Sequence, residues 1–172
     1  MLKSTSRGFT IVELLIVIVV IAILAAISIV AYNGIQERAR KSKVSSDLAT
    51  ISKAIQSARI NNDSSLIGVV PNGSTEGGCL SQPSGTNLAT LPASNSCWAY
   101  YNTAMQQISS KSGIDVSSIK DPWGRPYYIN PNEDENQTTH VCLSDYITTY
   151  KYPHVQNQTE PLQAIPYWKS SC

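Results

Sequence analysis

The chain has 172 residues, of which 42% are hydrophobic and 15% charged, and 13 basic against 12 acidic side chains give a formal charge of +1. This near balance lacks the basic excess that a nucleic-acid-binding domain usually carries, so we predict no specific nucleic-acid partner. One membrane helix would leave about 140 residues, enough for one compact domain with a single core.

The chain opens with a basic segment and a long apolar run that begins beside one carboxylate. Glu13 lies directly before the apolar residues from Leu14 to Ala31. An ionised side chain in a membrane helix costs roughly 2.5 to 3.5 kcal/mol, so an acid in this position indicates a functional site. A cut between Gly8 and Phe9 would create an α-amino group about one helical turn from Glu13. The two charges would then neutralise each other, within one chain or between neighbouring copies.

Lys3 and Arg7 before Gly8, followed by Phe9, Glu13 and the apolar run, resemble the class III leader of type IV pilins and of the pseudopilins of type II secretion. The resemblance covers residues 3–32. It implies that a membrane prepilin peptidase cuts after Gly8 and methylates Phe9, and that Glu13 is the assembly carboxylate. It divides this part of the chain into a leader peptide, residues 1–8, and a transmembrane and assembly helix, residues 9–32.

Two other interpretations of this segment remain open. A secretory signal peptide is removed after its apolar region and rarely contains an acid. A plain single-pass anchor explains the apolar run, because about 20 apolar residues span a bilayer, but it leaves Glu13 unexplained. Basic residues after the run outnumber the two before it and would favour the opposite orientation, so the predicted topology depends on the leader resemblance. The basic residues after the run, which we expect to face lipid head groups, are Arg38, Arg40, Lys41 and Lys43; a DNA-contacting stripe on an assembled fibre is the alternative.

The periodicity predicts that the helix continues beyond the membrane as an amphipathic segment, residues 33–60. Its apolar positions recur at spacings of three and four, which places them on one face. They are Val44, Leu48, Ile51, Ile55 and Ala58, with Ile35 and Ala39 extending the stripe upstream. One helix from Phe9 to about Arg59 would measure about 75 Å. We expect Gly34 to be its weakest point, because Gly costs about 1 kcal/mol relative to Ala.

The remaining residues, 61–172, are expected to form a globular head. Residues 61–97 are rich in turn-forming residues and predict a long connection with one short strand or turn of helix. Residues 98–112 predict a short helix that packs Tyr101, Met105 and Ile108 into the core.

A second motif, Asp121-Pro122-Trp123-Gly124, predicts a turn before a strand at Tyr127-Tyr128-Ile129. It is similar to the hallmark turn before the sheet of major pseudopilins and many pilins. Two further strands are expected at residues 138–143 and 145–151, which completes a turn-and-sheet region at 121–151. The tail, residues 152–172, is expected to be mostly coil with an edge strand at 162–168. The predicted class is α+β: a long N-terminal helix packed on a small antiparallel sheet, as in the pilin fold.

Four cysteines lie in the expected head, and their spacing does not suit a zinc site. An exported domain with an even number of cysteines favours disulfides, for which three pairings are possible. We prefer Cys79 with Cys97, which closes the connection, and Cys142 with Cys172, which ties down the chain end.

The acidic loop after the first strand is a candidate calcium site, because calcium binds about six to eight oxygen ligands and the resembled pseudopilins bind calcium in this region. Its candidate ligands are Glu133, Asp134, Glu135 and Asp145. A solvated hairpin loop is the alternative, since the Gly-rich ligand segment of those proteins has no match here. Otherwise we expect no cofactor.

No catalytic motif emerges, so we expect no enzyme. The sequence predicts a prepilin, a structural subunit for a type IV pilus-like fibre that serves adhesion, motility or DNA uptake. Its partners would be other pilin subunits, the prepilin peptidase and an assembly platform in the membrane. It would be located first in the inner, cytoplasmic membrane and then on the cell surface. A pseudopilin of type II secretion is one alternative; a membrane-anchored extracellular binding module that never polymerises is another.

Overall fold

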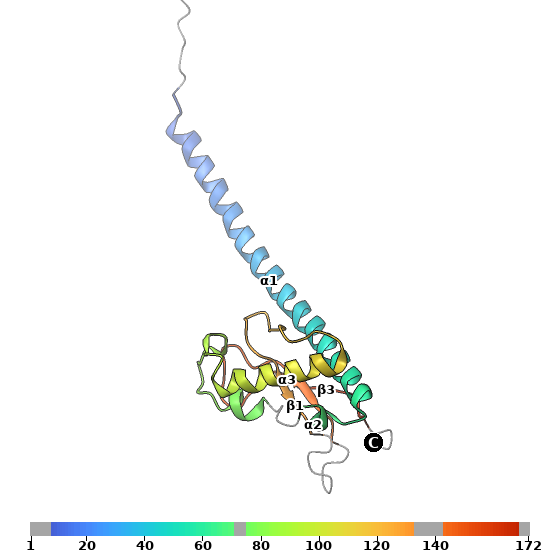
Figure 1. Cartoon of the computed structure of the whole chain (residues 1–172). Helices are drawn as coiled ribbons and strands as arrows, with labels where there is room; N and C mark the ends of the chain where they lie inside the picture. The colour runs from blue at the N-terminus through green and yellow to red at the C-terminus, as the bar shows by residue number, and fades with distance from the viewer. Residues whose placement is uncertain (1–7, 71–74, 133–142, 169–172) are drawn as a thin grey trace, which may run out of the picture. The chain divides into compact units, whose positions relative to one another are not determined.

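The computed structural model describes residues 8–70, 75–132 and 143–168. These residues belong to two compact units, divided between Lys41 and Ser42, and helix α1 (Ile11–Asn62) contributes to both. The helix is continuous through Gly34 and ends three residues beyond the predicted Arg59. Figure 1 shows the order of the elements along the chain.

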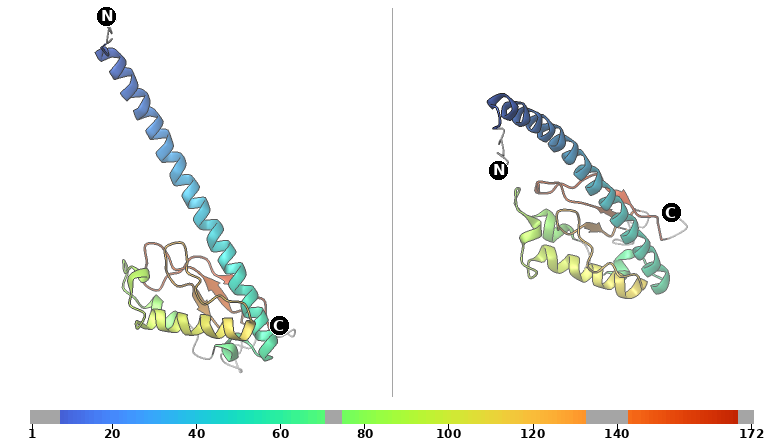
Figure 2. Two further views of the ribbon diagram at one scale, coloured as in Figure 1. Left: turned by 45° about the horizontal axis from the view of Figure 1, so that its top comes forward. Right: turned by 90° about the horizontal axis from the view of Figure 1, so that it is seen from above.

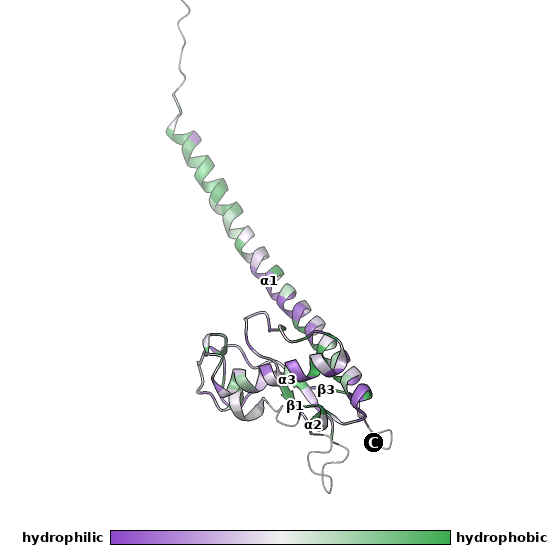
Figure 3. Ribbon diagram, viewed as in Figure 1, coloured by the Kyte–Doolittle hydropathy of each residue, from purple (hydrophilic) through white to green (hydrophobic). Residues whose placement is uncertain are grey.

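The first unit contains the apolar part of α1, drawn in green in Figure 3. The large apolar side chains described between Phe9 and Tyr32 are exposed, at 47 to 85%. By length and composition, α1 can cross a membrane. Ile35 and Ala39, which the spacing predicts on the same helix face as the apolar stripe, are also exposed.

In the second unit, the last turns of α1 bury one face. The predicted stripe from Leu48 to Ala58 is confirmed, with Val44 at its half-buried edge. Helix α3 (Ser96–Ser112) supplies Tyr101, Met105 and Ile108 to the same core, also as predicted. It begins two residues before the predicted Trp98, because the Asn95 side chain caps it by accepting a hydrogen bond from Cys97 N. Both views in Figure 2 show α3 and the strands beside this part of α1.

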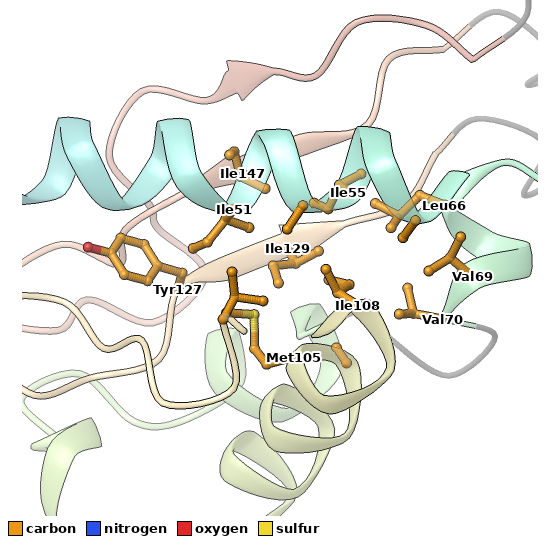
Figure 4. Close-up of a cluster of buried hydrophobic side chains, with 14 of the residues drawn as sticks. Ile51, Ile55, Leu66, Val69, Val70, Met105, Ile108, Tyr127, Ile129 and Ile147 are labelled. Carbon is orange, nitrogen blue, oxygen red and sulfur yellow. The ribbon is translucent and has the colours of Figure 1, made fainter. Parts of the chain in front are cut away.

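The three-stranded antiparallel sheet has the order β1 (Tyr128–Asn130), β2 (Tyr146–Thr148), β3 (Gln163–Ala164). Ile129 and Ile147 are paired in register and point into the core. In Figure 4, Ile51 and Ile55 of α1 approach Ile129 from one side, and Met105 and Ile108 of α3 from the other.

The strands are shorter than predicted. Of the strand predicted at 138–143, residues 138–142 lie outside the described residues and Leu143 is in no strand. The strand predicted at 145–151 is reduced to β2, with an isolated bridge at Tyr150, and the edge strand predicted at 162–168 is reduced to β3. Thr75 covers the outer edge of β1, because its N–H donates to Ile129 O at 3.0 Å and its Oγ1 accepts from Ile129 N at 2.8 Å.

The described part of the predicted coil-like connection, residues 63–70 and 75–97, holds three short helical segments: α2 (Leu66–Val69), η1 (Glu76–Leu80) and η2 (Leu88–Thr90). Leu66 and Val69, three positions apart, are both buried, which explains why α2 forms despite the turn-rich composition. The expected disulfide joins Cys79 of η1 to Cys97 of α3, and both cysteines are fully buried. The expected partners Cys142 and Cys172 lie outside the described residues.

Gly78 of η1 lies close to the backbone at the start of α3. A Cβ at this position would lie 2.7 Å from the carbonyl carbon of Ser96 and 2.8 Å from Cys97 N. We expect Gly78→Ala to lower the free energy of unfolding by about 1 to 3 kcal/mol, because the backbone of α3 must move. Urea unfolding of the full chain in detergent, followed by tryptophan fluorescence, measures this loss. Gly34→Ala, whose Cβ meets no atom within 4 Å, should leave head unfolding unchanged.

Candidate assembly site

The predicted processing and assembly residues lie together at the start of α1. Gly8 and Phe9 precede the helix and are exposed, and Thr10 is the last residue before its first turn. A Cβ at Gly8 would meet no atom within 4 Å, so neighbouring atoms do not require glycine at this position.

Thr10 and Glu13 form reciprocal hydrogen bonds at the helix start. Thr10 N and Thr10 Oγ1 donate to Glu13 Oε2 at 2.9 and 2.8 Å, and Glu13 N donates to Thr10 Oγ1 at 3.2 Å. This is a capping box, in which the two side chains satisfy N–H groups that the helix leaves unpaired. Both bonds to the carboxylate end on Oε2; within the described part of the chain, Oε1 accepts none. Glu13 therefore caps its own helix with Oε2, while Oε1 can still accept a hydrogen bond from another group.

The second motif is a turn fixed by a buried ion pair. Gly124 N donates to Asp121 O at 2.8 Å, and Gly124 has a φ of +76°, a conformation that favours glycine. Asp121 Oδ1 accepts from Trp123 N and Arg125 N at 2.9 and 2.8 Å, while Oδ2 accepts from Arg125 Nε at 2.7 Å. The aspartate thus holds both the turn and the arginine that follows it.

Arg125 connects this turn to the chain beyond β2. Its two terminal nitrogens donate to Lys151 O and Tyr150 O at 2.7 and 2.8 Å. Its guanidinium carbon lies 4.9 and 5.2 Å from the ring centres of Trp123 and Tyr152, which stack on each other at 5.0 Å. Asp121 and Arg125 are both buried, so this ion pair is part of the head core.

Asp47 links α1 to Tyr127, the residue directly before β1. Its Oδ2 accepts from Lys43 Nζ at 2.6 Å and from the Tyr127 hydroxyl at 2.7 Å. Burial, and then the hydrogen bond to Asp47, raise the pKa of Tyr127. The phenol therefore remains a protonated donor at physiological pH.

Comparison with known proteins bears on the N-terminal motif and on the family of the chain. Residues 3–29 match the family model described as the prokaryotic N-terminal methylation motif. Over 128 residues, the chain is 30% identical to type II secretion system core protein G of Escherichia coli (strain K12), and the match covers 74% of each protein. The chain belongs to the type IV pilin and pseudopilin family. It is a prepilin, a structural subunit.

Fimbrial relatives of this prepilin match over shorter stretches. Fimbrial protein Q of Moraxella bovis is 32% identical over 91 residues, which cover 53% of this chain and 58% of that protein. Type IV major fimbrial protein FimA of Dichelobacter nodosus is 38% identical over 60 residues, 35% of this chain and 38% of that protein. No solved structure matches.

One of the prepilin's predicted calcium ligands has another role. Asp145 is fully buried, its Oδ2 is paired with Arg59 of α1, and its Oδ1 accepts from Asn132 N at 2.6 Å. It joins the helix to the sheet, and both of its oxygens already have partners. The other candidates, Glu133, Asp134 and Glu135, lie outside the described residues, so a calcium site there stays a prediction.

Sequence reasoning missed three residues that the prepilin structure brings into these motifs. Thr10 was detectable, since a threonine three positions before a glutamate is the signature of a capping box. Arg59 was not, because its partner Asp145 lies 86 positions away. Arg125 lies only four positions from Asp121, but the Tyr150 and Lys151 carbonyls that it also binds lie 25 and 26 positions away.

Proposed function

We propose that this prepilin is cut between Gly8 and Phe9 by a prepilin peptidase, methylated on Phe9, and polymerised through α1 into a type IV pilus-like fibre. The observation that carries the proposal is a helix of exposed apolar side chains that begins with one carboxylate, Glu13. Soluble proteins rarely expose apolar surface on this scale, so the helix needs lipid or other helices around it. A prepilin has lipid around this helix before assembly and the helices of other subunits around it in the fibre.

Before assembly, lipid covers the apolar part of α1, which holds the chain in the inner membrane, where an assembly platform is its partner. In the fibre, the same side chains pack against α1 of neighbouring copies. The Phe9 amine of one copy meets Glu13 of the next, through the Oε1 atom that the capping box leaves open. An unpaired charge among apolar helices is expensive, so this contact rejects subunits that dock out of register.

A second candidate, a pseudopilus subunit of type II secretion, is favoured by the extent of one match. The similarity to the Escherichia coli core protein G covers 74% of this chain, whereas the fimbrial matches cover 53% and 35%. Deleting the gene and measuring secreted proteins alongside surface fibres separates the two. Loss of secretion with no loss of sheared surface fibres assigns the chain to a pseudopilus.

Mass spectrometry of the N-terminus tests processing directly. We expect the protein from cells to begin at a methylated Phe9, and a chain that still carries Met1 would instead support an anchored binding module that never polymerises. Gly8→Ala should be cut, at most more slowly, because space around Gly8 is open. Gly8→Leu should accumulate uncut, since the peptidase rather than the subunit imposes the small residue. Equal cutting of both variants would contradict a glycine-specific cleavage site.

A further inference from the structure

A group of basic side chains follows soon after the apolar part of α1. Over residues 14–46 the helix carries a single acidic residue, Glu37, against four basic ones: Arg38, Arg40, Lys41 and Lys43. In Figure 3, the green turns of α1 give way to white and purple turns further along the helix. The function proposed above uses the apolar turns and leaves these charges without a role.

The spacing along α1 places the basic group at the edge of a bilayer. The apolar turns from Ile11 to Tyr32 measure about 32 Å along the helix axis, and the hydrocarbon core of a bilayer is about 30 Å thick. Arg38 follows Tyr32 by six residues, or about 9 Å, and head groups occupy about 5 to 7 Å on each side of the core. Side chains of a helix tilt toward its N-terminus, here toward the membrane, and long basic side chains reach back to the interface. The basic group therefore meets the head groups when the apolar turns fill the core.

The contacts of the basic residues show which of them can bind an outside anion. Lys43 donates to Asp47 at 2.6 Å, within the compact unit that forms the head. Lys41 pairs with Glu37 at 3.5 Å, but these side chains are 77% and 53% exposed, and such surface pairs contribute little. Arg38 is exposed, and no carboxylate in the described part of the chain pairs with it. Arg38 and Lys41 are thus available to an anionic partner.

The arrangement of these charges favours a lipid layer over a nucleic acid. A helix turns about 100° per residue, so Arg38 and Arg40 lie about 160° apart, with Lys41 between them. Head groups surround a membrane helix on every side, whereas a nucleic acid approaches from one side. The chain also lacks the basic excess typical of nucleic-acid-binding proteins. The apolar turns directly before the group indicate the same partner, since they need lipid around them.

We propose that Arg38 and Lys41 bind the phosphate groups of anionic phospholipids and, together with Tyr32, fix the depth of α1 in the membrane before assembly. This inference rests on the membrane location in the proposed function, and it adds the class of lipid and the residues that select it. Tyrosine rings are enriched at the membrane interface, and such anchors set how a helix sits in the bilayer. Each basic residue near an anionic surface strengthens the attraction about fivefold, and salt weakens it.

Spin-labelled lipids test the inference on the full chain. The chain is reconstituted in phosphatidylcholine vesicles that contain a trace of spin-labelled phosphatidylglycerol or spin-labelled phosphatidylcholine. Electron paramagnetic resonance then measures the fraction of each labelled lipid that is held beside the protein. We expect phosphatidylglycerol to associate at least threefold more strongly than phosphatidylcholine at low salt. Sodium chloride at about 1 M should remove most of this preference, because it screens exposed charges.

Three variants test the assignment to these residues. The double variant Arg38→Gln with Lys41→Gln should lower the preference at least twofold. Arg38→Lys with Lys41→Arg keeps both charges and should retain it. Lys53→Gln removes another exposed cation of α1, twelve residues beyond Lys41, and should have no effect. The inference is overturned if the unaltered chain shows no preference, if the glutamine double variant retains it, or if Lys53→Gln lowers it equally.

Flotation of the vesicles after an alkaline wash measures membrane insertion separately. We expect the unaltered chain and every variant to float, because the apolar turns are unchanged. An unaltered chain that does not float would overturn the proposed membrane location and this inference with it. A chain that floats without a lipid preference would overturn this inference alone. Duplex DNA binding that is lost in the glutamine double variant, with the lipid preference unchanged, would assign the two residues to nucleic acid instead.

Discussion

Glu13→Gln is expected to abolish fibre formation while leaving an inserted, processed and correctly folded subunit. Glutamine at this position still accepts from Thr10 N and keeps the capping box, because that motif works with Glu or Gln. What it removes is the charge that we propose meets the Phe9 amine of the next copy. Truncating one partner of a desolvated charge pair costs about 2 to 5 kcal/mol, so subunit association should weaken at least about thirtyfold. Shearing of cells and immunoblotting with antibody to the head measures the loss.

The two roles of Glu13 are separated by comparing variants. Glu13→Ala removes both cap and charge and should also be processed but assemble poorly. Thr10→Ala removes the cap and leaves the charge, so it should weaken the helix start by about 1 kcal/mol and retain fibres. Glu37→Ala, which removes another exposed carboxylate of α1, should assemble normally. Normal fibre yield from Glu13→Gln would show that Glu13 serves only the cap and would refute the charge contact.

Asp121→Ala is expected to be the most damaging single change in the head. The substitution removes the carboxylate that pairs with Arg125 and leaves a buried guanidinium without its counter-charge. Breaking a buried ion pair by removing one partner costs about 3 to 5 kcal/mol, a large fraction of the about 5 to 15 kcal/mol that stabilises a domain. Urea unfolding of the full chain in detergent should show a midpoint lower by about 1 to 3 M.

The ion pair is distinguished from general sensitivity of this region by two comparisons. Lys151→Ala, next to the same contact, should change stability by less than about 0.5 kcal/mol, because Arg125 binds the Lys151 carbonyl and not its exposed side chain. The double variant Asp121→Asn with Arg125→Met should cost less than the sum of its single changes, since it leaves no lone buried charge. Additive losses would mean that the two side chains act separately.

Local and periodic signals in the sequence predicted much of the fold. The recurrence of Leu48, Ile51 and Ile55 predicted the buried face of α1, and Met105 and Ile108 predicted that of α3, because a helix presents every third or fourth residue to one side. The turn at Asp121 was also predictable, since proline restricts and glycine extends the backbone conformations that the chain can adopt locally. Strand lengths were overestimated, because pairing partners rather than propensity decide where a short strand ends.

By itself, the sequence determined the N-terminal segment of this prepilin: the residues that match the methylation motif, the position of Glu13 and an apolar run long enough for a membrane. These features depend only on neighbours along the chain. Only the tertiary structure decided that Asp145 pairs with Arg59 and that Arg125 binds the carbonyls beyond β2. A buried polar side chain pairs with whichever group the fold brings beside it, and the spacing of residues along the sequence does not predict which group that is.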